Sequence, residues 1–156
     1  MIPTRNLQHE LRQNRPFRSH AAEASIAILR TADVVRGRLA AIVEPSGVTL
    51  QQYNVLRILR GSSPDPLPTL EIGDRLIERV PGVTRLLDRL EEKHLVRRER
   101  CTEDRRRVHC WITEEGLALL AALDEPVDRA DRECVSVLSD GQLQLLIESL
   151  DTVRNV

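Results

Sequence analysis

Apolar residues recur at helical spacing along most of this chain, and residues that break helices separate the stretches. Leucine, isoleucine and alanine recur about every 3.6 positions over residues 21–43, which predicts a long helix that the Pro and Gly directly after it would end. Thr49 is suited to cap a second helix, and Thr69 to cap a short third helix running to about Arg79. Between these two helices, residues 61–68 contain three prolines and predict a stiff loop.

The fourth predicted helix, residues 81–93, has the sharpest division into two faces. Its apolar residues lie at i, i+3, i+4 and i+7 and form one stripe that predicts a buried face: Val83, Leu86, Leu87 and Leu90. Small, polar and charged residues occupy the opposite face. Pro81 fits the first helical position, which tolerates the missing N–H of proline.

Two short runs after this helix are predicted to be strands, residues 95–101 and 107–112, with a polar tip between them. In the second run, Val108, Cys110 and Ile112 alternate with polar or aromatic neighbours and would share an inward face. Thr113 then caps a long helix, and Ser139 with Asp140 caps a last one. The three middle helices and the hairpin together predict a winged helix-turn-helix within a mainly α fold.

Composition excludes several classes of protein. Aromatic residues are 2% of the 156 residues, which argues against base-stacking RNA-binding modules and against an aromatic-lined ligand groove. No apolar run approaches the roughly 20 residues of a membrane span, and residues 1–20 lack the apolar stretch of a secretory signal. Three irregularly spaced cysteines do not form a disulfide framework. We therefore expect a soluble, cytoplasmic protein with no membrane partner.

The formal net charge of −1 hides an uneven distribution of charged residues. Residues 75–112 contain eleven basic and seven acidic residues, whereas residues 113–156 contain three basic and ten acidic ones. Residues 1–20 carry four arginines and one glutamate, which predicts a flexible basic arm. All but one of the 23 basic residues are Arg, whose planar fork suits phosphates and guanine edges. A basic region on a nearly neutral chain favours a nucleic-acid partner.

The segment 48–123 resembles the MarR family of bacterial transcription regulators. The run TRLLDRLE at residues 84–91 is similar to the family's recognition helix, and Asp104-Arg105-Arg106 is similar to its D-x-R wing signature. Residues 78–82 depart from the Gly-Leu-Ser turn of many members. The resemblance implies an obligate homodimer that binds double-stranded operator DNA, and control by a small molecule or an oxidant. We predict no cofactor.

The predicted DNA contacts are small or basic residues at the start of the fourth helix, on its outer face and on the hairpin: Pro81, Gly82, Thr84, Arg85, Arg89, Arg100, Arg105, Arg106 and Arg107. Arg85 and Arg89 lie one turn apart, and each could fork onto a guanine in the major groove. By resemblance, Arg106, with Arg105 as second candidate, would enter the minor groove. Asp104 would orient a guanidinium at the tip. The alternative is a solvated helix on which Asp88 and Glu92 pair with these arginines.

The resemblance and the unpartnered apolar stripes together predict dimerisation through the ends of the chain. The domain organisation is then an arm at 1–20, a dimerisation helix at 21–45, the winged domain at 46–112, and C-terminal helices at 113–156 that complete the dimer region. The predicted interface residues are apolar and lie on the terminal helices: Leu29, Leu143, Leu146, Ile147 and Leu150. A two-fold dimer would bury them and present two recognition helices on successive turns of DNA.

Cysteine and histidine residues near the hairpin raise the question of a metal. His109 and Cys110 are adjacent in a strand and point to opposite faces, and no C-x-x-C spacing occurs, so we predict no metal site. Buried cysteines usually act as small apolar residues. Cys101, which lies among arginines at the end of a strand, is the one candidate for a redox role.

The function predicted from the sequence is a dimeric DNA-binding transcription regulator. We expect a repressor on a palindromic operator, released by a small molecule or an oxidant. The alternative is a winged-helix module that binds protein without specific DNA recognition. An enzyme is not expected, because the sequence contains no P-loop, nucleophile elbow, dinucleotide fingerprint or His-Glu-x-x-His motif.

Overall fold

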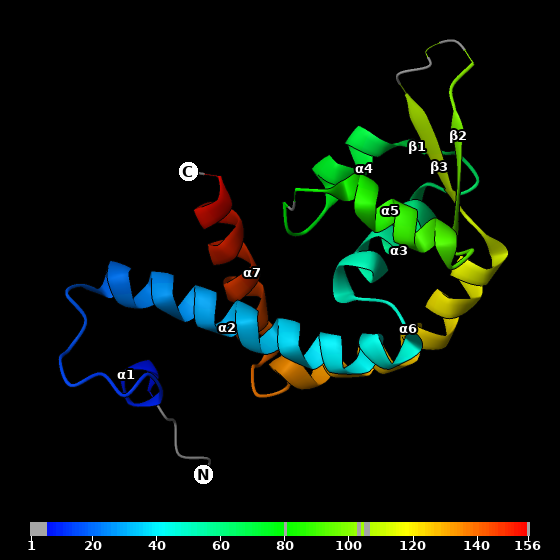
Figure 1. Ribbon diagram of the computed structural model, residues 1–156. Coiled ribbons are helices and arrows are strands. Elements are labelled where there is room, and N and C mark those ends of the chain that lie inside the picture. Colours follow the sequence, from blue (N-terminus) through cyan, green and yellow to red (C-terminus); the bar gives the residue numbers. More distant parts are fainter. Residues whose placement is uncertain (1–5, 80, 103, 105–106, 156) are drawn as a thin grey trace. The chain divides into compact units, whose positions relative to one another are not determined.

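The computed structural model describes residues 6–79, 81–102, 104 and 107–155. Over these residues the chain is mainly helical, with one three-stranded antiparallel sheet in the order β1-β3-β2 (Figure 1). The predicted fold class, mainly α with a small β wing, is confirmed. The chain divides into two units, Met1–Arg38 and Leu39–Val156, and each is described by itself.

The first unit contains α1 (Leu7–Glu10) and most of α2 (His20–Val43). The side chain of Asn6 accepts a hydrogen bond from the His9 N–H and caps α1. Glu10 forms an ion pair of 2.7 Å with Arg30 of α2. The prediction of a flexible arm over residues 1–20 is therefore corrected by α1. A four-residue helix is too short to leave a periodic signal, and here a cap and an ion pair support it.

The second unit is built around one apolar core. Its helices are the end of α2, α3 (Leu50–Ser62), α4 (Thr69–Arg75), α5 (Val83–Glu92), α6 (Glu114–Val135) and α7 (Asp140–Arg154), with a short 3-10 turn at Glu44–Ser46. The predicted capping residues Thr49, Thr113 and Ser139 each accept a backbone N–H at a helix start. The first half of α6 packs on α3, and Leu120 is fully buried. None of the described helices has the length and apolar character needed to cross a membrane.

The sheet contains one strand more than the predicted hairpin. β2 (Val96–Arg100) and β3 (Val108–Ile112) form the expected antiparallel pair, which we call the wing. β1 (Leu67–Pro68) adds to the other side of β3, where Leu67 pairs with Cys110. The sequence analysis assigned this segment to a loop because of its prolines. Pro68 is tolerated here because β1 is an edge strand.

The helix α4 begins and ends differently from the prediction. Thr69 is its first residue rather than its cap, and the preceding Pro68 offers no side-chain cap. The Thr69 hydroxyl instead donates to the Val108 carbonyl of β3 at 3.4 Å, which ties α4 to the sheet. The helix stops at Arg75 instead of near Arg79, because Leu76 turns to an extended conformation and its side chain is buried.

The chain makes a close joint where α5 ends, β2 begins and α6 starts. His94 adopts a left-handed conformation (φ 58°), and the Leu95 N–H donates back to the Leu90 carbonyl at 3.0 Å, as in a Schellman motif. The Thr113 hydroxyl donates to the His94 carbonyl at 2.7 Å. A Cβ at Gly116 would lie 2.4 Å from the Leu95 carbonyl oxygen, closer than Cβ atoms approach backbone. Gly116 therefore permits α6 to begin against β2.

Replacement of Gly116 by Ala is expected to destabilise the protein strongly. The new methyl group would collide with the Leu95 backbone, which has no free rotation to relieve the contact. The expected loss is about 3 kcal/mol in the free energy of unfolding, with a fall in Tm of roughly 10 °C. Gly141→Ala in α7 is the matched control, because nothing lies within 4 Å of its Cβ position. Equal melting temperatures for the two variants would contradict the close joint.

Candidate nucleic-acid interface

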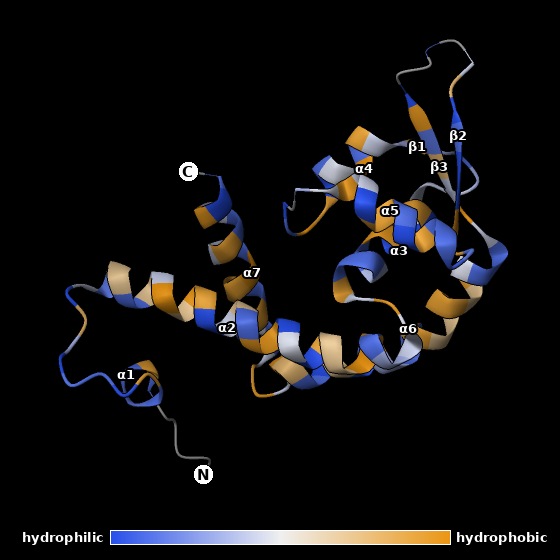
Figure 2. Cartoon of the chain, in the orientation of Figure 1, coloured by the Kyte–Doolittle hydropathy of each residue, from blue (hydrophilic) through white to orange (hydrophobic). Residues whose placement is uncertain are grey.

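The helix α5 presents one face to the core and the other to solvent, as Figure 2 shows by its alternating orange and blue bands. On the inner face, Leu87 and Leu90 are fully buried, as the apolar stripe predicts. The helix begins at Val83, and the residue before it, Gly82, has a φ of 100° that only glycine adopts without strain. Pro81 therefore lies two residues before α5, and its predicted place at the first helical position is wrong. The residue directly before the helix is Gly82, and its left-handed conformation turns the chain into α5.

The outer face of α5 carries two arginines that point away from the core. Thr84, Arg85 and Arg89 are exposed. Over the part of the chain that the structure describes, no carboxylate lies within ion-pair distance of Arg85 or Arg89. The alternative raised by the sequence, in which acidic neighbours on the same helix neutralise these arginines, is therefore wrong. The guanidinium groups of Arg85 and Arg89, one helical turn apart, remain available for an anionic partner.

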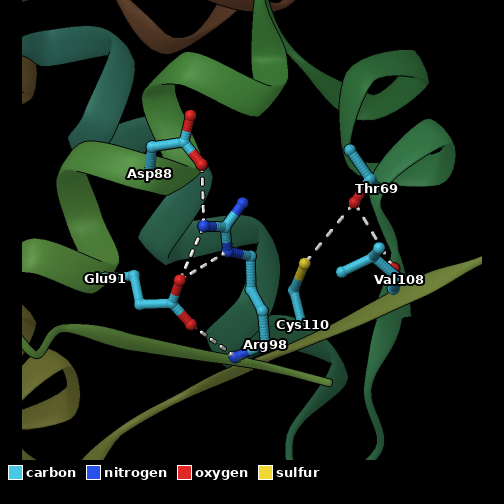
Figure 3. Close-up of polar contacts among 6 residues, drawn as sticks. All are labelled: Thr69, Asp88, Glu91, Arg98, Val108 and Cys110. Atoms are coloured by element: carbon cyan, nitrogen blue, oxygen red, sulfur yellow. Dashed lines mark hydrogen bonds and ion pairs between the residues drawn. The ribbon is translucent and has the colours of Figure 1, made fainter. Parts of the chain in front are cut away.

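Two carboxylates of α5 pair instead with an arginine of β2 (Figure 3). Arg98 Nη2 lies 2.7 Å from Asp88 Oδ1 and 2.6 Å from Glu91 Oε2. Glu91 also accepts the backbone N–H of Arg98 at 3.1 Å, so it satisfies a donor of an edge strand. Burial lowers the pKa of Arg98, but the hydrogen bonds that its guanidinium donates to Glu91 and Asp88, with the charge of these carboxylates, outweigh that effect and leave the pKa raised. We call Asp88, Glu91 and Arg98 the Arg98 cluster.

The remaining wing arginines divide into two groups. Arg97, on the face opposite to Arg98, stacks on Trp111 with its guanidinium carbon 4.2 Å from the ring centroid, and it also pairs with Glu99. Arg100 and Arg107 are exposed near the tip. The hairpin arginines therefore do not form one uniform set. The strand alternation separates them, because Arg98 faces α5 whereas Arg97 faces outward.

At the wing tip, Asp104 lies close to Arg107. The Arg107 N–H donates to the Asp104 carbonyl at 2.9 Å, and the two side chains approach to 3.9 Å. Arg107 is therefore a candidate partner for Asp104 among the described residues, and the orienting role of Asp104 stays a prediction. Arg105 and Arg106, the predicted minor-groove residues, lie outside the residues that the structure describes.

The surface near the start of α5 contains residues that the sequence analysis missed. Leu70 of α4 and Ile77, in the turn after it, are 83% and 84% exposed, which is unusual for large apolar side chains. An open groove of about 480 Å³ lies between α4 and the start of α5, with Arg79 and Thr84 on its lining. The Ile77 N–H donates to Asn54 of α3 at 3.0 Å and holds the turn. Leu70 and Ile77 are seven residues apart and would share one helix face, separate from the face of Ile72 and Leu76, and this second apolar face is the signal that could have found them.

Comparison with known proteins agrees with this geometry. The model of the MarR family matches residues 48–108. The HTH-type transcriptional regulator MhqR of Bacillus subtilis is 30% identical over 111 residues, which cover 71% of this chain and 75% of that protein. The chain belongs to the MarR family. The homoprotocatechuate degradative operon repressor of Escherichia coli is 27% identical and covers 81% of this chain and 84% of its own length.

Solved structures share the fold of this chain. The crystal structure of a MarR transcription factor from Planctomyces limnophilus is 38% identical, with a TM-score of 0.62 over 88% of this chain and 99% of that one. The structure of NadR in complex with 4-hydroxyphenylacetate is 26% identical, with a TM-score of 0.70 over 89% of this chain and 97% of that one. The protein is therefore a MarR-type, DNA-binding transcription regulator and not an enzyme.

The residues predicted for a MarR dimer interface are incompletely covered within each unit. In the first unit, Leu29 is 71% exposed. In the second, Leu146 and Ile147 of α7 are exposed, and Leu143 and Leu150 are half-buried. Apolar stretches along α7 are visible in Figure 2. The predicted apolar residues of α7 therefore lie at the surface of the second unit, and within that unit no described residue buries them fully.

The three cysteines differ in their environments. Cys110 is fully buried between β1 and β2, with its sulfur 3.7 Å from the Thr69 hydroxyl. Burial raises its pKa, and the Thr69 hydrogen bond and Arg98 oppose that shift by smaller amounts. Cys101 and Cys134 are half-buried. No group of three or more candidate metal ligands occurs among the described residues.

Thiol reactivity is expected to follow these environments. Iodoacetamide at neutral pH should modify Cys101 and Cys134 in the folded protein, and Cys110 only after unfolding in guanidinium chloride, because a buried thiol with a raised pKa forms little thiolate. Peptide mass spectrometry measures each site. Burial also raises the pKa of Cys110 in the folded state above its ordinary value of 9.0. The unfolded chain therefore loses the thiol proton first, and the free energy of unfolding should fall as pH rises above 9.0. Rapid labelling of Cys110 in the folded state would show that the sheet opens.

Proposed function

We propose that this regulator is a homodimeric repressor that binds an imperfect palindromic operator. The observation that carries the proposal is the outer face of α5, where Arg85 and Arg89 have no carboxylate partner among the described residues. In this proposal α5 enters the major groove, where each arginine reads a guanine edge. Pro81, Gly82 and Thr84 are small enough for the start of α5 to approach the duplex, and its free N–H groups suit a phosphate.

The wing supplies the second set of DNA contacts in this proposal. Arg100 and Arg107 lie near its tip and are exposed. They meet the phosphate backbone beside the minor groove, where charge rather than base identity sets the affinity. Arg105 and Arg106 stay predictions for the minor groove itself. Asp104 limits the freedom of Arg107 and therefore lowers the entropy lost on binding.

Dimerisation in this proposal buries the apolar residues of α2 and α7 against a second copy. Two recognition helices related by a two-fold axis then face half-sites whose centres lie about 10–10.5 bp apart, or a multiple of that spacing. Binding of a small molecule, or oxidation at Cys101, would release the operator. The NadR complex with 4-hydroxyphenylacetate and the name of the Escherichia coli repressor support a small-molecule signal and repression.

Substitutions on α5 and on the wing are expected to have different effects on DNA binding. Arg85→Ala should weaken operator binding by about 1–3 kcal/mol and flatten the base preference at symmetric positions. Arg107→Ala should weaken binding to all sequences and reduce the slope of log affinity against log salt by roughly one unit per subunit. The measurement is a salt series of fluorescence anisotropy, on an operator selected from random duplexes and on a scrambled duplex.

The matched control is Arg129→Ala, an exposed arginine of α6 that pairs with Glu125 and should leave both quantities unchanged. A selected operator without two-fold symmetry would contradict the dimeric arrangement. If the protein retains neither operator nor scrambled duplex at low salt, the winged domain binds a protein instead, which is the alternative function considered from the sequence.

The dimer interface can be tested at α7. Ile147→Arg replaces a 47% exposed apolar residue with a charge that a buried interface cannot hydrate, so it should shift the protein toward monomer in sedimentation and weaken operator binding. Gln144→Arg adds the same charge to the same helix at an exposed polar position, where Glu148 can pair with it. It should remain dimeric. A fully dimeric Ile147→Arg variant would exclude α7 from the interface.

A further inference from the structure

The Arg98 cluster is the contact that joins the recognition helix to the wing. The Arg98 side chain is 19% exposed, the least among the paired arginines of the described chain. Its guanidinium contacts two carboxylates on successive turns of α5, and Glu91 contacts both its Nε and its backbone N–H (Figure 3). A guanidinium held by several hydrogen bonds fixes the orientation of β2 against α5 as well as the distance between them.

The same part of the sheet also contacts the other helix of the helix-turn-helix. Arg98 pairs in register with Cys110 of β3, whose sulfur meets the hydroxyl of Thr69 at the start of α4. Thr69 in turn donates to the Val108 carbonyl. Arg98 therefore lies at the point where α4, α5 and both wing strands come together.

Asp88 gives the cluster a second consequence. It lies between Arg85 and Arg89 in the sequence of α5, and its side chain is 47% exposed. An unpaired carboxylate at this position would repel the phosphates that the two arginines are to approach. Arg98 draws Asp88 toward the wing and neutralises it.

We propose that Arg98 is a positioning residue that fixes the wing relative to α5, so that the two elements engage DNA as one rigid unit. The inference rests on the proposed function, in which α5 reads bases and the wing contacts phosphates. Loss of Arg98 frees the wing, whereas α5 stays held by Leu87 and Leu90. The wing contact should then fail while base reading by α5 survives.

The test compares Arg98→Met with Arg97→Met in the full-length protein. Both variants remove one positive charge from β2, but Arg97 stacks on Trp111 on the opposite face and does not contact α5. Each is combined separately with Arg107→Ala and with Arg85→Ala, and anisotropy salt series are recorded on the selected operator. In the Arg98→Met background, Arg107→Ala should no longer change the salt slope, while Arg85→Ala should still flatten base preference. In the Arg97→Met background both effects should persist.

The proposal would be overturned if Arg107→Ala changed the salt slope as much in the Arg98→Met background as in the otherwise wild-type protein. Arg98→Lys should restore part of the wing effect, since an ammonium can pair with one carboxylate but cannot span both. If Arg98→Met does not fold, Asp88→Asn with Glu91→Gln removes the same ion pairs at nearly constant shape, and the same criterion applies.

Hydrogen exchange gives a readout that requires no DNA. Arg98→Met should speed exchange of the β2 amides by about tenfold while α5 stays protected, because the wing opens locally without global unfolding. Arg97→Met should not. Unchanged exchange in β2 would overturn the proposal. If Arg85→Ala and Arg107→Ala leave the otherwise wild-type protein unaffected on DNA while β2 exchange responds as expected, the proposed DNA contacts fail and the positioning role stands.

Discussion

The carbonyl oxygen of Leu95 leaves no space for a side chain at Gly116 of α6. The direction of the wing depends on this close approach between β2 and α6. The same oxygen accepts the Thr113 N–H at 3.2 Å, so one atom holds both the start of β2 and the start of α6. β2 begins at the next residue, Val96, and β3 ends just before Thr113. The bases of both strands are therefore fixed at one point, and any freedom of the wing lies toward its tip.

Arginines of the same chain segment serve two physical purposes in this molecule. Arg98, which meets two carboxylates of α5 at close range, loses most of its exposure and stabilises packing between elements. The arginines on the outer face of α5 keep their hydration and their charge. Net charge alone does not distinguish the two, because the sign is equal and only the direction of the side chain differs. The basic character of residues 75–112 therefore overstates the charge available to a polyanion.

The sequence was sufficient for the parts of the fold that rest on repeated local signals. Apolar spacing predicted the long helices, and the caps at Thr49 and Thr113 marked their starts correctly. β1 was missed because two residues cannot show a period, and only pairing with β3 makes them a strand. The start of α5 was misplaced because proline at residue 81 and glycine at residue 82 are both common near helix starts. Only the left-handed φ of Gly82 decides between them.

The candidate site was predictable in its residue types but not in its pairings. Arg85 and Arg89 were identified from their face of the helix, which a 3.6-residue period determines. The partners of Asp88 were not, since Arg98 lies ten residues away on a strand. A signal was nevertheless present: Arg98 is two residues after the buried Val96, so the two share the inward face of β2. A charged residue on such a face requires a partner of opposite charge nearby.

Trp111 is the only tryptophan of the chain, and it lies in β3. The Arg97 guanidinium covers the indole, and the His109 ring meets it edge-on with centroids 6.1 Å apart. Light absorbed by tryptophan alone therefore gives emission that comes entirely from the wing. Indole emission is sensitive to the polar and charged groups around the ring, so the emission of Trp111 depends on the state of this stack. The protein thus contains its own optical reporter for wing movement, with no attached dye.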